Sequence, residues 1–457
     1  MRIAKTLMFS MFVAVGAVAS PGCNPYDFNS TLEKAPVMSF GASGSSTDSV
    51  FVLPMSPPDP STGVAARMLV SNEVSRYLAV ADYDKNGKVT LHQPSAAEYD
   101  NLGDAAVTSM ADRGDGTILL GTPSYGGSST PPGRASTLTL TTQADGSVGF
   151  GIQSSIQGGG TVGTHLGISV AAGRLAGLAG GNYSIIVGDS TLQVLGADPK
   201  LPIASPDAAC QQYVNLTSSS NSTFRPVIVA DLIGSDGVDE IVLSGQIGGT
   251  AGPGTVVFFT YNGTSVLGCP KTLHRGSSAT FGTSLAFGDF DGDQHLDLAV
   301  GNPPDTVYVF FGPLDDVTDQ TVAGVTITSP TATNFGQRLA TYQLPGQTTA
   351  LLVSDPYATV GERQNAGKVM LFNNITRFKP TMSTSDAVAT LFDSNQDSNL
   401  NAFGAVSLGG LQFNTSICSP GGGATQLVPW VSTSGNILTF FNYSNPTSPV
   451  TDPRCFK

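Results

Sequence analysis

Short apolar runs alternate along the chain with segments rich in Gly, Pro, Asn and Asp. Residues 281–310 show the pattern most clearly, since three apolar runs at 285–288, 298–301 and 307–310 are separated by an acidic segment and a turn. Apolar runs of this length between turn residues indicate β-strands rather than helices. The pattern therefore predicts an all-β protein.

The order of strand, loop, strand, turn and strand occurs seven times, at a mean spacing of about 58 residues. A fixed period in a strand-rich chain is typical of a propeller or a solenoid, and a closed ring exposes only short sheet edges. We therefore predict a seven-bladed β-propeller over residues 61–457. The middle strands of the seven copies end at Ala81, Gly121, Gly188, Leu243, Gly301, Ser354 and Ser432.

The N-terminal residues have the composition of a secretory signal peptide. Arg2 and Lys5 give a positive start, and residues 6–20 are mostly apolar but too few to span a bilayer comfortably. We expect residues 1–22 to be a signal peptide and the mature protein to be exported. Residues 23–60 form an N-terminal segment, and we expect the apolar run at 50–53 to close the ring by pairing with the last blade.

Two cleavage positions are compatible with this signal. Cleavage after Ala19 would release a soluble secreted or periplasmic protein. Cleavage before Cys23, where the sequence resembles a bacterial lipoprotein box, would leave a lipidated N-terminus at the outer membrane or cell surface. The count of five cysteines favours lipidation, because four then remain for two disulfides. These four are Cys210, Cys269, Cys418 and Cys455; Cys210–Cys269 and Cys418–Cys455 are the sequence-local pairs among three possible connectivities.

Residues 281–303 begin with Phe-Gly, continue through Asp-Phe-Asp-Gly-Asp and end with Asp-Leu-Ala-Val-Gly-Asn-Pro. This segment resembles the FG-GAP repeat found in the seven-bladed propeller of integrin α chains. Weaker copies near residues 106, 163, 224 and 335 share its rhythm. The resemblance implies a β-propeller with calcium in the intact loops, and a role in binding or adhesion more often than in catalysis.

The acidic loop of this copy has the side-chain chemistry of a calcium site. Calcium prefers six to eight oxygen ligands, often from closely spaced carboxylates, and Gly292 permits the tight bend that such a loop needs. Four carboxylates occupy loop positions 1, 3, 5 and 9, and the residue at position 7 would contribute its backbone carbonyl rather than its ring. The expected Ca²⁺ ligands are Asp289, Asp291, Asp293, His295 and Asp297.

The other acidic segments are weaker candidates. The fourth copy keeps Asp231 and Asp239 eight residues apart but has Ile233 and Ser235 between them, so that it has lost two carboxylates. Residues 112–116 of the second copy are too few to align without a gap.

Two further segments can be interpreted in two ways. Residues 82–87 resemble the start of an EF-hand loop, but the turn of a β-hairpin is the better interpretation because Asn86-Gly87 favours such a turn. Residues 393–399 alternate oxygen-bearing side chains and are better explained as a loop between blades.

The net charge of −13, with only 12% charged residues, argues against a nucleic-acid surface. We find no HExxH pair, no G-x-S-x-G turn and no P-loop. The sequence therefore favours an exported, monomeric propeller that binds a protein or glycan at the cell surface, through insertions such as 141–162 or 126–133. A polysaccharide lyase or hydrolase and a passive scaffold of an envelope complex remain alternatives, and any membrane contact would be through a lipid on Cys23.

Overall fold

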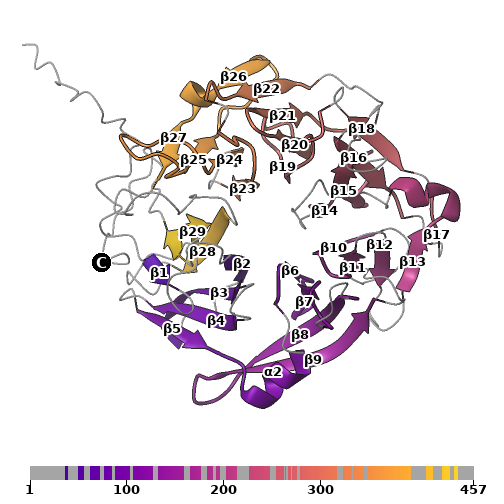
Figure 1. Ribbon diagram of the computed structural model, residues 1–457, viewed down its shortest axis with the longest axis vertical. Coiled ribbons are helices and arrows are strands. Elements are labelled where there is room, and N and C mark those ends of the chain that lie inside the picture. Colours follow the sequence, from indigo (N-terminus) through magenta and orange to yellow (C-terminus); the bar gives the residue numbers. More distant parts are fainter. Residues whose placement is uncertain are drawn as a thin grey trace, which may run out of the picture.

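A computed structural model describes most of the chain between residues 37 and 440. The gaps in this description are residues 40–49, 56–61, 73–76, 85–87, 103–105, 127–131, 159–164, 176–182, 189–191, 196–201, 214–225, 247–253, 262, 264–265, 269, 275–277, 316–322, 332, 344–347, 393–407, 415–424 and 433–436. The described residues form seven separate sheets of four or five strands around a central axis (Figure 1). The predicted all-β propeller is confirmed.

Six of the sheets consist mainly of consecutive strands, and we number them as blades 1 to 6 from the N-terminus. Blade 1 contains β2 (Val50–Met55), β3 (Val64–Asn72), β4 (Tyr77–Asp84) and β5 (Val89–His92). Blade 2 contains β6 (Ser109–Asp112), β7 (Thr117–Thr122), β8 (Arg134–Thr142) and β9 (Val148–Gln157). Blade 3 contains β10 (Ser169–Gly173), β11 (Tyr183–Val187), β12 (Leu192–Leu195) and β13 (Pro202–Pro206), with β17 (Val266–Leu267) added at its edge.

The next three blades contain the intact repeat and its neighbours. Blade 4 contains β14 (Val227–Ala230), β15 (Glu240–Gln246), β16 (Gly254–Phe259) and β18 (Lys271–His274). Blade 5 contains β19 (Leu285–Gly288), β20 (Asp297–Asn302), β21 (Thr306–Phe310) and β22 (Val325–Thr328), with β26 (Thr381–Ser383) added at its edge. Blade 6 contains β23 (Leu339–Gln343), β24 (Thr349–Asp355), β25 (Lys368–Phe372) and β27 (Ala389–Leu391).

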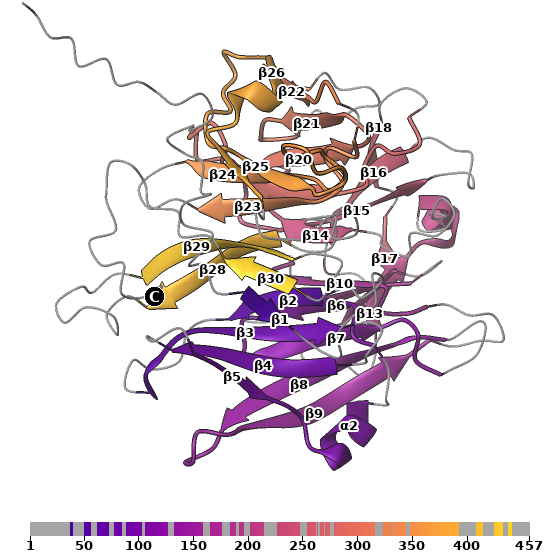
Figure 2. The same ribbon diagram turned by 60° about the vertical axis from the view of Figure 1, so that its left-hand side comes forward.

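The seventh sheet combines the first and the last strands of the described part of the chain. It contains β28 (Leu408–Asn414), β29 (Thr425–Ser432) and β30 (Ile437–Phe440), and β1 (Val37–Ser39) pairs antiparallel with β30 as its outer strand (Figure 2). Only six blades are therefore built from their own repeat, and the seventh is composite. The prediction that residues 50–53 pair with the last blade is wrong, because these residues lie in β2 and pair with β3 of blade 1.

The turn at the start of a blade, Phe-Gly in blades 5 and 6 and Leu-Gly in blade 3, has the same backbone form in these three blades. Gly167, Gly282 and Gly336 all have φ between +87° and +88°, a conformation that glycine adopts without steric cost. Each glycine N–H donates to a carbonyl at the end of the second strand of its own blade, at 2.9 to 3.0 Å. In blade 6 the preceding Phe335 N–H donates to the carbonyl of Pro304 in blade 5 at 2.9 Å. The repeat therefore links neighbouring blades through its backbone.

The hydrophobic core is divided among the interfaces between blades. One cluster combines Phe290, Val307 and Val309 of blade 5 with Leu351 and Val353 of blade 6, all of them at most 1% exposed. A similar cluster joins blades 4 and 5. Others join blades 1 and 2, blades 2 and 3, blades 3 and 4, and blade 6 with Leu408 of the seventh sheet. A single blade exposes a face that it cannot bury alone, so burial favours the complete ring.

Two of the segments predicted as loops or turns lie at least partly in strands of blades 1 and 2. Residues 141–162, predicted as an insertion, instead contain the whole of β9, which pairs with β8 along a nine-residue strand. The hairpin interpretation of 82–87 is supported, because Asp82 and Tyr83 lie in β4 and pair with β5. Residues 393–399 and most of 126–133 lie outside the described residues.

Helical structure is short in the described part of the chain. The structure contains α2 (Ala96–Leu102) and two 3-10 turns, η2 (Ala208–Tyr213) and η3 (Thr384–Asp386). Ser95 and Glu98 cap α2 reciprocally, since the Glu98 N–H donates to Ser95 Oγ at 3.3 Å and the Ser95 N–H to Glu98 Oε2 at 2.6 Å. Among the described residues, no helix has both the length and the apolar character needed to cross a membrane.

Candidate metal centre

The acidic loop of blade 5, which we define as residues 289–297, connects its innermost strand β19 to β20. The two strands pair antiparallel up to Gly288 and Asp297, so that the two ends of the loop lie side by side. Gly292 and Gln294 have φ values of +85° and +72°, which let the chain reverse within a few residues. The carbonyl of Asp289 accepts the Thr349 N–H of blade 6 at 2.8 Å. The loop is therefore held between blades 5 and 6.

This fold brings three of the predicted ligands together. One carboxylate oxygen each from Asp289, Asp291 and Asp297 lie within 4.8 Å of one another. Asp289 is oriented by the N–H groups of Gly292 and Gln294, at 2.7 and 3.0 Å. These bonds fix the direction of the carboxylate before any cation binds.

Asp297 is the buried member of this group, with 0% of its surface exposed. Its two oxygens accept the backbone N–H groups of Phe290 and Gly312 at 2.8 and 2.9 Å. Burial raises the pKa of Asp297 to about 7; Asp291 and Asp293 add to the rise, whereas the two backbone hydrogen bonds oppose it. A bound cation would relieve both the burial cost and the repulsion between carboxylates.

An arginine from blade 6 supplies positive charge to the same loop. Arg377 lies in the outer loop of blade 6, which we define as residues 373–388 between β25 and β27 and which includes η3 and the short strand β26 at the edge of blade 5. Its Nε donates to Asp291 at 2.5 Å and a terminal nitrogen donates to Asp293. The guanidinium also donates to the Gly312 carbonyl at 3.0 Å and lies over the Phe311 ring, 5.0 Å from its centroid. Sequence reasoning missed this residue.

Asp293 and His295 lie at the edge of the site. Asp293 is outside the group of three, and its carboxylate instead contacts Arg377. The His295 ring is 2.8 Å from Ser235 Oγ of blade 4, so that its Nδ1 is engaged between blades. The role predicted for the His295 carbonyl remains a prediction.

The donor set fits a hard cation such as calcium. All three clustered groups are carboxylates, and a flexible oxygen-rich site of this kind suits Ca²⁺ better than a transition metal, which prefers nitrogen or sulfur ligands. Asp289, Asp291 and Asp297 would hold the ion, which would supply two positive charges where these three carboxylates meet.

The acidic loop of blade 4 (residues 231–240) has nearly the same backbone form. Its Asp231 accepts the Gly237 N–H at 2.7 Å, as Asp289 accepts that of Gln294. The register places Glu240 opposite Ala230, as Asp297 lies opposite Gly288. Glu240, rather than the predicted Asp239, is therefore equivalent to Asp297.

The acidic loop of blade 4 is one residue longer than that of blade 5, which places Glu240 rather than Asp239 opposite Ala230. Asp239 instead accepts the Arg174 N–H of blade 3 at 2.6 Å. Glu240 Oε2 accepts the N–H groups of Leu232 and Ile233, each at 2.9 Å. Burial raises the pKa of Glu240 to about 7. In this blade the buried carboxylate fixes the loop backbone, and no group of three ligands occurs there among the described residues.

An aliphatic residue of the next blade shares a buried cluster with a residue of each acidic loop. Leu314 of blade 5 belongs to the same buried cluster as Leu232 of blade 4, and its N–H donates to the Leu232 carbonyl at 2.7 Å. Ile375 of blade 6 shares a buried cluster with Phe290 of blade 5 in the corresponding arrangement. The candidate metal centre therefore lies at a junction between blades.

One of the five cysteines, Cys210, lies among the described residues. Cys210 lies in η2 and is 1% exposed, whereas the other four cysteines lie outside the described residues. Pro206, shortly before Cys210, pairs with Leu267, two residues before Cys269. The Cys210–Cys269 pair, the second pair and the lipidation of Cys23 all stay predictions.

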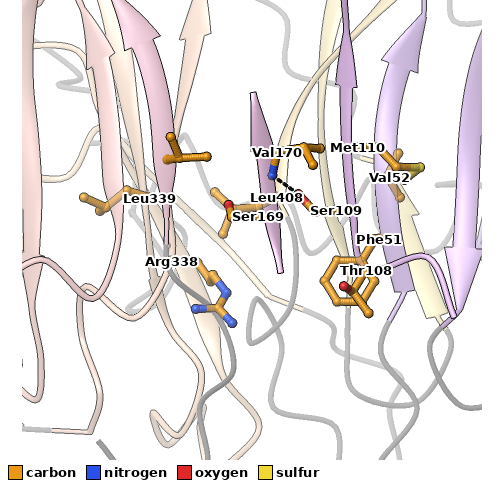
Figure 3. Close-up of a pocket in the computed structure, with 11 residues that line it drawn as sticks. Phe51, Val52, Thr108, Ser109, Met110, Ser169, Val170, Arg338, Leu339 and Leu408 are labelled. Carbon is orange, nitrogen blue, oxygen red and sulfur yellow. Dashed lines mark hydrogen bonds between the residues drawn. The ribbon is translucent and has the colours of Figure 1, made fainter. Parts of the chain in front are cut away.

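A cavity of about 230 Å³ lies among the innermost strands around the axis. Figure 3 shows Arg338 on one side of it and Phe51 and Thr108 on the other. Arg338 is the one charged residue among the described lining residues, and burial lowers its pKa to about 10. This cavity is separate from the acidic loop and was not predicted.

Comparison with known proteins identifies the repeat. Residues 281–310 match the model of the FG-GAP repeat family. No curated protein matches the chain.

Among solved structures, the chain is similar to Saccharomyces cerevisiae Sqt1, with 11% identity, coverage of 87% of this chain and 97% of that chain, and a TM-score of 0.48. It is also similar to a chain in the complex of BBS1N with ARL6DN, with 11% identity, coverage of 89% and 97%, and a TM-score of 0.46. A chain of Chaetomium thermophilum Polycomb Repressive Complex 2 has 8% identity, coverage of 89% and 97%, and a TM-score of 0.46. The repeat match and the ring of sheets together show that the chain is a β-propeller that contains an FG-GAP repeat.

Proposed function

We propose that this protein is an exported propeller that binds a protein or glycan partner at the cell surface, with one calcium ion stabilising the acidic loop of blade 5. The observation that carries the calcium part is the group of three carboxylates within 4.8 Å of one another. Export is supported by the N-terminal sequence, which has the pattern of a signal peptide.

The position of the loop supports a stabilising role for calcium rather than a catalytic one. The loop contacts blade 4 through His295 and Ser235, and blade 6 through Asp289 and Thr349. A cation in this loop would strengthen contacts among three blades. The ring would then hold its surface loops in fixed positions, which favours binding because less loop entropy is lost on association.

Binding measurements on the soluble chain from residue 24 test the proposal. The chain is titrated against immobilised glycans and extracellular matrix proteins, in calcium and in chelator, while reducing ends and unsaturated sugars are assayed as products. Saturable binding that weakens in chelator, without product release, is the expected result. Product release would favour the alternative of a polysaccharide lyase or hydrolase, and co-purification with envelope proteins alone would favour a scaffold.

Asp291→Asn provides a control in the same experiment. This change removes charge from the acidic loop and keeps an oxygen that can accept the Asp293 N–H. It should reproduce the effect of chelator in the presence of calcium. If binding is equally strong in wild type and variant, with and without calcium, calcium has no part in the function.

A further inference from the structure

We propose that Arg377 is an internal counter-ion that competes with calcium for Asp291 and Asp293, and that it thereby sets the calcium affinity of the acidic loop. This inference rests on the proposed calcium site and adds a regulating residue to it. Arg377 is 84 residues beyond Asp293 in the chain and comes from another blade. Nothing in the loop sequence itself indicates its presence.

The contacts of Arg377 carry the proposal. Its guanidinium contacts two different carboxylates, Asp291 through Nε and Asp293 through a terminal nitrogen. Asp291 is also one of the three clustered ligands, and its side chain is only 7% exposed. An oxygen that accepts a charge-assisted hydrogen bond is a poorer ligand for a second cation, because the two positive charges repel each other at this distance.

The surroundings of Arg377 hold it near the loop. Its guanidinium donates to the Gly312 carbonyl and lies over the Phe311 ring, while the nearby Ile375 is 1% exposed in the core shared with blade 5. The arginine side chain is nevertheless 47% exposed, so it can turn into solvent without unpacking that core. Calcium can therefore displace the guanidinium while the outer loop of blade 6 stays anchored at Ile375 and by the pairing of β26 with β22.

Competition has a reciprocal consequence. If Arg377 weakens calcium binding, calcium weakens the attachment of Arg377 by the same factor. The residues after Ile375, including the 98% exposed Phe378, would then exchange amide hydrogens faster in calcium. This coupling would transmit the state of the acidic loop to an exposed aromatic residue on blade 6.

Calcium titration of Arg377→Met tests the proposal. Methionine keeps apolar contact with Phe311 but removes the charge, so calcium affinity by calorimetry should rise about 10-fold, as expected for loss of roughly 1.4 kcal/mol of competition. Arg377→Lys should fall between wild type and Arg377→Met. Lys379→Met is the matched control, because Lys379 lies in the same outer loop but pairs with Asp386 at 2.5 Å.

Thermal unfolding gives a readout that does not depend on affinity. In chelator, Arg377→Met should unfold at a lower temperature than wild type, because the carboxylates lose their counter-ion. In saturating calcium the two proteins should unfold at similar temperatures. A purely structural role for Arg377 would instead lower the unfolding temperature of the variant in both solutions.

The calcium titrations distinguish failure of the competition by Arg377 from failure of the calcium site itself. Equal or weaker calcium binding by Arg377→Met would overturn the competition and leave the calcium site standing. Absence of calcium binding in both proteins would overturn the competition and the calcium part of the proposed function together. Calcium binding by the variant alone would mean that Arg377 blocks the site in wild type, which supports the inference.

Discussion

At the scale of single residues, the buried carboxylates at the start of the second strands are the most informative groups. Asp297 and Glu240 occupy equivalent positions in blades 5 and 4, and both orient the backbone of the preceding loop. The spacing of aspartates in the sequence predicted Asp297 but selected Asp239 in blade 4, because a one-residue insertion is invisible without the strand register. Arg377 could not be predicted from the loop at all, since it approaches from the next blade.

Glu240 allows a prediction about pH. Burial raises the folded-state pKa of Glu240 from 4.5 to about 7. Its contribution to the free energy of unfolding is therefore complete below about pH 4.5 and is lost as pH rises through 7. Glu240→Gln stays neutral and can still accept from Leu232 and Ile233. In chelator at pH 8 the variant should therefore be more stable than wild type, on the order of 2 kcal/mol.

Urea unfolding at pH 4.5 and pH 8 measures this difference. The two proteins should have nearly equal stability at the lower pH. Glu362→Gln changes an exposed glutamate in blade 6 and serves as the control for the loss of one charge. A variant less stable than wild type at pH 8 would show that the charged form of Glu240 is favoured in the folded protein.

At the scale of elements, the strand pattern was predictable because each blade repeats the same sequence of apolar runs and turns. The Phe-Gly turns and the Leu-Gly turn of blade 3 were visible as motifs, and the structure gives their reason: Gly167, Gly282 and Gly336 need a positive φ. The long β8–β9 hairpin was mistaken for an insertion because its outer strand has a weak apolar pattern, with alternating exposed positions. Helix α2 was not predicted, although Ser95 and Glu98 form the Ser-x-x-Glu pattern of a capping box.

Gly301 permits the close approach of blades 5 and 6. A Cβ atom at this position would lie 2.2 Å from the Gly336 carbonyl oxygen and 2.2 Å from Ser284 Oγ, so that the backbone must shift. Gly301→Ala should destabilise the protein by about 2 kcal/mol, as overpacking of a tight interface does. Gly268→Ala, with no atom within 4 Å of the added Cβ, should leave the unfolding temperature nearly unchanged. Equal stability of the two variants in urea unfolding would contradict this account of the blade interface.

At the scale of the whole molecule, the ring depends on contacts between blades and on its closure. The propeller could be predicted from the repeat, but the closing strand could not, since β1 has only three residues and little apolar pattern. Residues 50–53 were the more obvious strand, yet their full pairing with β3 assigns them to blade 1. Closure by β1 joins residues near the two ends of the chain, and its loss would leave the seventh sheet without its outer strand.

Truncation tests the importance of this closure. A chain that starts at residue 41 lacks β1, whereas a chain that starts at residue 35 keeps it and serves as the matched control. We expect the shorter chain to unfold several degrees lower than the control in a thermal scan, because an open ring exposes sheet edges and blade faces. Equal unfolding temperatures would mean that β1 contributes little to closure.

The central claim is that calcium stabilises the folded propeller through the acidic loop of blade 5. The most direct measurement is thermal unfolding of the chain from residue 24, in calcium and in chelator, for wild type and Asp291→Asn. Calcium at a hundredfold excess over its dissociation constant should stabilise the wild type by about 2.7 kcal/mol and the variant much less. An unfolding temperature that is the same in calcium and chelator for wild type, with no metal found by elemental analysis, would contradict the claim.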